Sequence, residues 1–142
     1  MAKTIAEIES ELVEEFSLFD DWMDKYQQII EMGQALPGLP EAEKTEENRV
    51  HGCQSQVWLT ARAEEGVILY QADSDAIITK GLIAMMVRVL SGQTPEAILA
   101  AELGFVDRVG IRSHLSPTRS NGLNNMIKRM KYIALALRAQ AA

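Results

Sequence analysis

Hydrophobic residues recur at three- and four-residue spacing over the first part of the chain, a pattern typical of helices that bury one face. The first apolar stripe comprises Ile5, Ile8, Leu12 and Phe16. Thr4 and Glu7 have the spacing of a capping box at its start. We therefore predict a first helix over residues 4–17.

A second helix is predicted to begin after Asp20 or Asp21, because either side chain can cap it. Its apolar stripe comprises Trp22, Tyr26, Ile29 and Ile30. Gly33 is placed to end this helix. Residues 34–47 hold two prolines and an acidic cluster, so we expect a surface connection with at most a short turn of helix.

The pattern changes to period two at residue 57, where apolar and polar side chains begin to alternate as in a half-buried strand. Residues 64–66 are typical of a turn, and the apolar run 67–70 predicts a returning strand. If residues 48–50 pair as a short preceding strand, the sheet is an antiparallel meander of three strands. Residues 51–54 then form a connecting turn.

The most apolar stretch, residues 76–91, is hydrophobic almost all the way round and predicts a central helix packed on the sheet. Ser74 or Asp75 can cap this helix, and Gly81 is expected to permit close approach of a neighbour. The stretch falls short of the roughly 20 apolar residues that a membrane span needs. We therefore expect a buried helix and no membrane span.

Two shorter helical pieces are predicted next. The first starts at Thr94, with Pro95 at the first helical position, and Gly104 is placed to end it. Residues 105–112 are predicted to form a further helical piece.

The final helix is expected after residues 115–122, which are rich in turn-forming residues, with Ser120 or Asn121 as its cap. Its apolar stripe comprises Leu123, Met126, Ile127, Met130, Ile133 and Leu137. This order of elements predicts one α+β domain over residues 1–142, with a small antiparallel sheet flanked by helices.

Composition narrows the class of protein. A chain of 142 residues can bury a core without a disulfide or metal staple. Residues 1–50 hold 13 acidic and 4 basic residues, whereas residues 51–142 hold 7 and 10. The net charge of −6 disfavours nucleic-acid binding, although the two halves can steer a charged protein partner. The absence of a leader pattern and the unpaired cysteine predict a cytoplasmic protein.

Cys53 is the only cysteine, and it stands just before the first predicted strand. A lone sulfur closes no intrachain disulfide, and with two histidines in the chain it makes a poor soft-metal site. A buried inert thiol, an intermolecular link and a nucleophile remain. Gly52 allows unusual backbone conformations, and Gln54 and Ser55 bring polarity, which favours a reactive thiol presented on a loop.

Several cysteine chemistries lack residues that they need. A hydrolase requires a histidine base near Cys53, but turn geometry can separate His51 from the sulfur, and nothing in the sequence supports His114. Thioredoxin-like chemistry needs a second cysteine at position 56, which is glutamine. Iron–sulfur and zinc sites need more thiolates, and no phosphate-binding glycine motif occurs. A carrier, which takes a group from one protein and gives it to another, fits a single thiol.

Residues 48–58, with the sequence Asn-Arg-Val-His-Gly-Cys-Gln-Ser-Gln-Val-Trp, closely resemble the active-cysteine motif of the SufE family of sulfur-acceptor proteins. Further segments resemble the family in its own order, namely residues 33–37, 73–76, 80–82, 94–95 and 115–123. The resemblance spans nearly the whole chain and implies a fold similar to the IscU-type scaffold.

The resemblance implies a function. A pyridoxal-phosphate cysteine desulfurase of the SufS or CsdA kind would donate sulfur to Cys53 as a persulfide, and the sulfur would pass to an iron–sulfur scaffold. The chain itself would need no cofactor or metal. The loop of Cys53 is expected to be sheltered at rest and extended on docking, with Val50, Val57 and Trp58 as the lining of the shelter.

Arg119, Asp75 and Gln54 are candidates for supporting Cys53 or contacting the partner. A guanidinium near the thiol would favour the thiolate, but Arg119 also fits a surface arginine in a turn. Capping a helix would explain Asp75 by itself. A different class of function is a non-covalent adaptor that stimulates the desulfurase while Cys53 stays idle. The sequence leaves both a monomer and a homodimer open.

Overall fold

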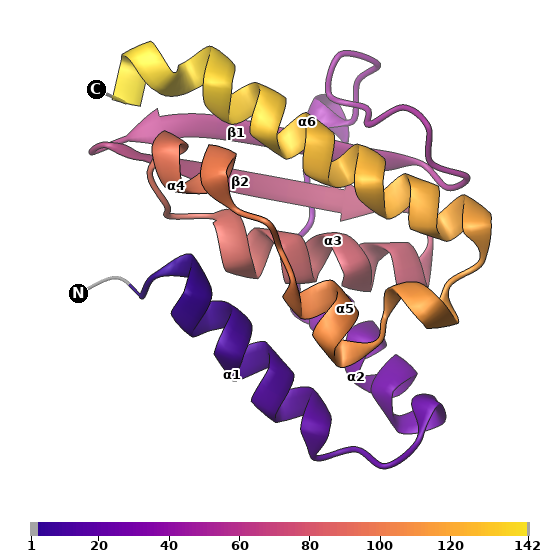
Figure 1. Ribbon diagram of the computed structural model, residues 1–142. Coiled ribbons are helices and arrows are strands. Elements are labelled where there is room, and N and C mark those ends of the chain that lie inside the picture. The colour runs from indigo at the N-terminus through magenta and orange to yellow at the C-terminus, as the bar shows by residue number, and fades with distance from the viewer. Residues whose placement is uncertain (1–2, 142) are drawn as a thin grey trace.

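The computed structural model describes residues 3–141, which form a mixed helix and strand structure (Figure 1). In chain order the elements are α1 (Ile5–Ser17), α2 (Trp22–Ala35), η1 (Glu41–Glu43), β1 (Val57–Glu64), β2 (Val67–Ser74), α3 (Ile77–Leu90), α4 (Pro95–Ala100), α5 (Phe105–Val109), η2 (Arg112–His114) and α6 (Pro117–Ala141). The predicted α+β class is confirmed. Within the described residues, no helix is long and apolar enough to cross a membrane.

The sheet of the described chain consists of β1 and β2 alone, so the prediction of three strands is wrong in its strand count. Residues 48–50 do lie beside β1, but they form only one isolated bridge, between Arg49 and Trp58. The backbone then turns at His51 and at Gly52, where φ is 84°. Because this turn takes the chain out of the extended conformation, the pairing does not grow into a strand.

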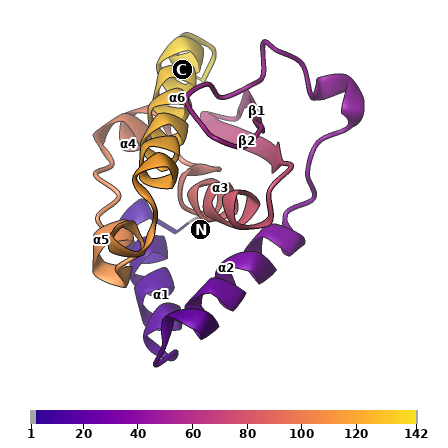
Figure 2. The ribbon, with the colours of Figure 1, turned by 90° about the vertical axis from the view of Figure 1, so that its right-hand side faces the viewer.

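One face of the hairpin carries the core. Alternate residues along the two strands point to that face, and Leu59, Ile68 and Tyr70 among them are buried. Helices α3 and α6 both pack against the hairpin, as Figures 1 and 2 show. The Tyr70 hydroxyl donates to the carbonyl of Met130 in α6 at 2.6 Å, and its backbone N–H donates to Ser91 at the end of α3. These two hydrogen bonds fix α3 and α6 on the hairpin.

Helices α2 and α3 cross at two glycines. A Cβ added to Gly33 would lie 2.7 Å from the backbone nitrogen of Gly81, and a Cβ added to Gly81 would lie 2.2 Å from the carbonyl oxygen of Ile29. The close approach expected at Gly81 is therefore confirmed, but Gly33 does not end α2. The helix continues to Ala35. The absence of a side chain at Gly33 instead allows α3 to approach α2 closely.

Asp73 on the outer side of the hairpin anchors the connection between α2 and β1. Its carboxylate accepts hydrogen bonds from the backbone N–H groups of Leu39 and Ser74, and it forms ion pairs with Lys44 at 3.3 Å and Lys80 at 3.5 Å. Burial would raise the pKa of Asp73, but these donors and cations outweigh burial and lower it. The predicted connection is thus a fixed segment, with η1 as its short helical turn.

Several predicted helix starts are correct and several are not. Thr4 forms the expected capping box, and Asp21 and Thr94 cap α2 and α4. Helix α3, however, has Ala76 as its N-cap, with no capping hydrogen bond from a side chain. Helix α4 ends before Gly104, which instead precedes α5.

Helix α6 begins earlier than predicted. It starts at Pro117, so Ser120 and Asn121 lie inside it. The side chain of Ser116 accepts a hydrogen bond from the Arg119 N–H at 3.2 Å, and proline is well suited to the first helical position. The turn-rich composition of this segment therefore marks a helix start, not a loop.

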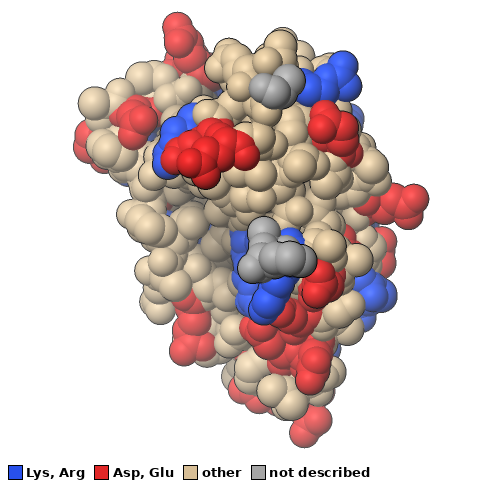
Figure 3. All heavy atoms as spheres, turned by 90° about the vertical axis from the view of Figure 1, so that its left-hand side faces the viewer, with Lys and Arg blue, Asp and Glu red and all other residues tan. Residues whose placement is uncertain are grey.

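Helix α1 carries five of the thirteen acidic side chains of residues 1–50. Figure 3 shows acidic side chains gathered over the lower part of one face, where α1 lies in Figure 1. Some of them pair with other elements: Arg88 of α3 bonds Glu15 at 3.0 Å, and Arg108 of α5 bonds Glu9 at 3.0 Å. These pairs join α1 to α3 and α5.

Candidate functional site

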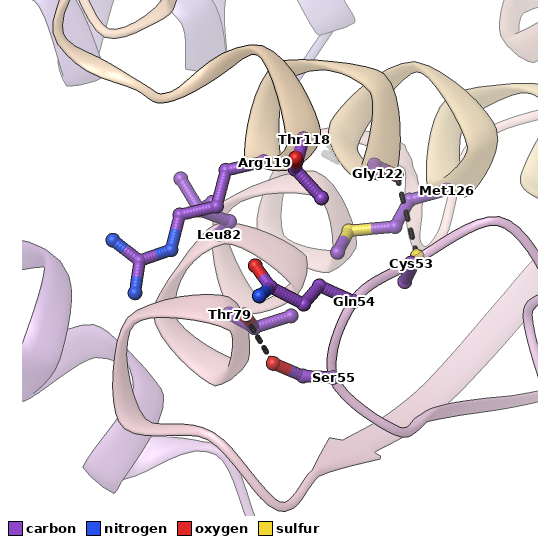
Figure 4. A pocket seen from close by; sticks show the side chains of 9 residues that line it. All are labelled: Cys53, Gln54, Ser55, Thr79, Leu82, Thr118, Arg119, Gly122 and Met126. Atoms are coloured by element: carbon purple, nitrogen blue, oxygen red, sulfur yellow. Dashed lines mark hydrogen bonds between the residues drawn. The ribbon is translucent and has the colours of Figure 1, made fainter.

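Cys53 lies in the segment between the bridge at Arg49 and the start of β1; we call residues 51–56 the Cys loop. The thiol is half-buried, and its Sγ is 3.6 Å from the carbonyl oxygen of Gly122 in α6, to which it donates (Figure 4). A Cβ on Gly122 would lie 3.5 Å from the same sulfur. Glycine at this position therefore keeps free space between α6 and the thiol.

The thiol faces a narrow cleft between the Cys loop, α3 and α6. The cleft is lined by Cys53, Gln54, Ser55, Thr79, Leu82, Thr118, Arg119, Gly122 and Met126 (Figure 4). Its cavity volume is about 10 Å³, which is of the order of one water molecule. The site is thus an atom-sized space beside a thiol and not a pocket for a small-molecule substrate.

The lining predicted from sequence is wrong. Val50 and Val57 are 2% and 0% exposed and belong to the hydrophobic core. Trp58 follows Val57 in the strand and therefore points to the opposite face, where the Lys44 ammonium lies 5.4 Å from its ring centroid. Residues close to Cys53 in sequence support the loop, whereas helices distant in sequence cover the sulfur.

Hydrogen bonds tie the Cys loop down at both ends. The Asn125 side-chain amide of α6 donates to the Gly52 carbonyl at 3.0 Å. At the other end, the Gln56 N–H donates to the Asp75 carboxylate at 3.0 Å, and the Ser74 hydroxyl donates to the Gln56 carbonyl at 2.8 Å. A Cβ at Gly52 would lie 2.2 Å from the Asn125 amide nitrogen, so the first of these ties requires glycine.

Burial raises the pKa of the Cys53 thiol, and the positive charge of Arg49 offsets only part of this effect. The thiolate is the reactive form of cysteine. The closed loop therefore holds Cys53 in its protonated, weakly nucleophilic state. Exposure of the thiol to water would lower its pKa toward the ordinary value.

The three supporting residues predicted from sequence occupy different positions. Arg119 and Gln54 line the cleft with Cys53, but the Arg119 guanidinium points away from the sulfur in Figure 4. The cation that acts on the thiol is Arg49. Asp75 holds the Cys loop through Gln56 and does not cap α3, contrary to the capping expectation. The roles of these residues in function stay predictions.

Neither histidine forms a dyad with Cys53. His51 is exposed and its Nε2 lies 3.3 Å from Glu46, while the ring of His114 stacks on Trp22 with centroids 3.7 Å apart. Among residues 3–141, the Gly122 carbonyl is the one hydrogen-bond partner of the sulfur. The same part of the chain holds no cluster of three or more histidine, cysteine or acidic side chains that could bind a metal.

Sequence reasoning misses six residues of this site: Thr79, Leu82, Thr118, Gly122, Asn125 and Met126. The local composition assigns Gly122 to a turn, although a glycine within a helical pattern is itself a sign of close packing. Leu82 and Met126 are ordinary apolar helix positions. No local signal distinguishes Thr79 or Asn125 from other polar residues on a helix surface.

We expect Asn125→Ala to raise the rate at which iodoacetamide alkylates Cys53 by roughly fivefold. The substitution removes one hydrogen bond of about 1 kcal/mol that holds the loop closed. The rate is measured by mass spectrometry at neutral pH, with Asn124→Ala, the exposed neighbour in α6, as the matched control. An unchanged rate in Asn125→Ala, or an equal increase in the control, would show that Asn125 does not restrain the loop.

Comparisons with known proteins identify the family of this chain. Residues 10–134 match the SufE family, described as an Fe-S metabolism associated domain. An uncharacterised SufE-like protein of Rhizobium meliloti is 39% identical over 126 residues, which cover 85% of this chain and 90% of the relative. SufE-like protein 1 of Arabidopsis thaliana, a chloroplastic/mitochondrial protein, is 43% identical over 128 residues, which cover 89% of this chain and 34% of that protein.

A solved structure shares the fold. The solution structure of a hypothetical protein from Thermus thermophilus aligns with a TM-score of 0.75 at 24% identity, over 91% of this chain and 94% of that one. The family match covers most of the chain and includes the whole Cys loop together with α3 and most of α6. With a relative of almost the same extent at 39% identity, the chain belongs to the SufE family and has a role in iron–sulfur metabolism.

Proposed function

We propose that this protein is a sulfur carrier. Cys53 takes the terminal sulfur of a persulfide on a pyridoxal-phosphate cysteine desulfurase and passes it on for iron–sulfur cluster assembly. The observation that supports this most directly is the half-buried thiol on a tied loop, facing a cleft with room for about one atom. Neither histidine contacts the sulfur, so the geometry favours transfer of a group over hydrolysis.

The proposed transfer is a thiol exchange at sulfur. The Cys53 thiolate attacks the terminal sulfur of the donor persulfide, and a new S–S bond forms on Cys53. The S–S bond of the donor breaks, and the donor cysteine leaves with the electron pair as a thiolate. The proton lost by Cys53 balances the proton that this thiolate takes up. No net oxidation occurs, so the step requires no metal or external oxidant.

The closed loop suits the state between acceptance and delivery. A persulfide exposed to small thiols is lost by the same exchange reaction, whereas the cleft beside Cys53 shields the sulfur between α3 and α6. The raised pKa of the thiol also disfavours side reactions before a partner docks. Loop opening on the desulfurase then exposes the sulfur and restores its reactivity.

The test is an intact mass measurement after incubation with a cysteine desulfurase and cysteine. We expect an increase by the mass of one sulfur atom, located by peptide mapping to the peptide that contains Cys53 and removed by a reducing thiol. Omission of the desulfurase provides the control. If no sulfur is gained, or the sulfur is found on a peptide without Cys53, the proposal is wrong.

The proposal includes the cytoplasm as the location, because that compartment keeps thiols reduced. The Arabidopsis relative is a chloroplastic/mitochondrial protein, so the family is not confined to one compartment. Fractionation of cells that produce the protein from its own gene would test the location directly.

A further inference from the structure

A second groove lies along α6 next to the Cys loop, and the sulfur-transfer chemistry does not use it. Its volume is about 320 Å³, far larger than the cleft at Cys53. The residues that line it are Val50, His51, Asn125, Lys128, Arg129 and Tyr132. Because Asn125 also bonds the Gly52 carbonyl, the groove adjoins the loop that carries the thiol.

The groove carries two cationic side chains, Lys128 and Arg129. Within residues 3–141, neither Lys128 nor Arg129 forms an ion pair. Arg129 donates from Nη2 to the Glu47 carbonyl at 3.0 Å, but its Nε is buried and has no hydrogen-bond partner in the described chain. A buried donor without an acceptor is uncommon in proteins, so the hydrogen-bonding capacity of this half-buried guanidinium is only partly used by the described chain.

The walls of the groove are partly apolar. Val50 is a buried residue of the hydrophobic core. Tyr132 is 64% exposed, which is unusual for so large a side chain. A glutamate or aspartate side chain on an extended peptide would place its methylene carbons on these walls and its carboxylate on Lys128 and Arg129. Charge complementarity and the apolar walls together therefore fit an acidic peptide better than a bare inorganic anion.

We propose that this groove binds an acidic segment of the protein that exchanges sulfur with Cys53. The identity of that partner rests on the proposed function, whereas the binding of acidic peptide does not. Nucleic acid would meet the same two cations, so the experiment below tests it directly against the peptide. Opposite charges on the two proteins would orient the partner so that its reactive group meets the Cys loop.

The experiment uses the whole protein and fluorescein-labelled hexaglutamate, with binding followed by fluorescence anisotropy at low salt. We expect saturable binding that weakens about tenfold in Arg129→Gln, which loses a positive charge, and at least as much in Lys128→Glu, which reverses a charge. Lys128 is exposed, so its substitution leaves the fold intact. Arg138→Gln, at an exposed position on α6 outside the groove, is expected to bind within about twofold of the wild type.

Two competitors test the chemical class of the ligand. Hexauridylate and inorganic phosphate are both expected to displace the peptide poorly. Tighter binding of hexauridylate would assign the groove to nucleic acid, and displacement by low concentrations of phosphate would assign it to a simple anion; either result would overturn the proposal. Absence of saturable peptide binding, or an equal loss in Arg138→Gln, would overturn it as well.

The same measurement separates this proposal from the proposed function. Cys53→Ser is expected to bind hexaglutamate with unchanged affinity, because the sulfur does not line the groove. If the peptide binds while no sulfur is ever found on Cys53, the proposal for the groove is supported and the proposed carrier function is refuted. If Cys53 accepts sulfur while the peptide does not bind, the carrier function is supported and the proposal for the groove is refuted.

Discussion

Cys53→Ser is expected to reduce sulfur acceptance to the background level while leaving the fold and the complex with the desulfurase intact. Serine has nearly the same shape, and its hydroxyl can still donate to the Gly122 carbonyl in the closed loop. Its oxygen, however, is a weak nucleophile without an adjacent general base, and neither histidine reaches this position. The added sulfur is measured by intact mass, and binding to the desulfurase by titration.

The same variant separates a carrier from an adaptor. If Cys53 removes sulfur from the desulfurase, Cys53→Ser should lose the stimulation of cysteine turnover, measured as alanine formed from cysteine. Ser55→Ala is the matched control, because it changes a neighbouring loop residue of the same cleft without touching the thiol. Full stimulation by Cys53→Ser would establish the adaptor and refute the carrier, since an adaptor acts without Cys53 chemistry.

Gly81→Ala is expected to lower the free energy of unfolding by about 3 kcal/mol or more. The added Cβ would lie 2.2 Å from the carbonyl oxygen of Ile29 and 2.8 Å from its carbonyl carbon. These atoms belong to the backbone of α2, so no side-chain rotation can relieve the clash. Helices α2 and α3 would have to move apart.

Urea denaturation measures this effect, and Gly104→Ala provides the control. No heavy atom lies within 4 Å of a Cβ added at Gly104, and its φ of −62° suits alanine. We expect the control to change the free energy of unfolding by less than about 1 kcal/mol. A stability of Gly81→Ala close to that of the wild type would mean that α2 and α3 do not approach as closely as described.

This crossing also matters for the candidate site. Helix α3 carries Thr79 and Leu82, which line the cleft and flank Gly81 in sequence. A displacement of α3 would therefore change the space beside Cys53. Gly81→Ala is expected to alter the reactivity of the thiol as well as the stability, whereas Gly104→Ala is not.

Local patterns predicted most helices and the hairpin because their signals lie within a few residues. The capping box of Thr4 and Glu7 and the apolar spacing that follows it describe α1 correctly. The prediction failed where two interpretations share one local signal. Gly33 fits a helix end as well as a helix contact, and the contact with Gly81, 48 positions away in the sequence, decided between them.

The candidate site shows the same division. Cys53 and its loop could be predicted from the sequence, because glycine, a lone thiol and the flanking strand signal are neighbours in the chain. The cover over the sulfur could not, because Gly122 is 69 positions away and joins the site only when α6 packs on the hairpin. Arg119 shows the limit of a partial prediction: it lines the cleft as a neighbour of Cys53, but its charge points elsewhere (Figure 4).

The sequence by itself determined the α+β class, the position of the thiol in a loop before a strand, and the kinds of chemistry that a single cysteine excludes. These depend on residue types and short spacings, which are the same in the unfolded chain. Only the tertiary structure decided that the thiol is closed against α6, that its pKa is raised, and that a cationic groove adjoins it. Burial and electrostatic environment arise from atoms that folding brings together across the chain, so short spacings in the sequence do not reveal them.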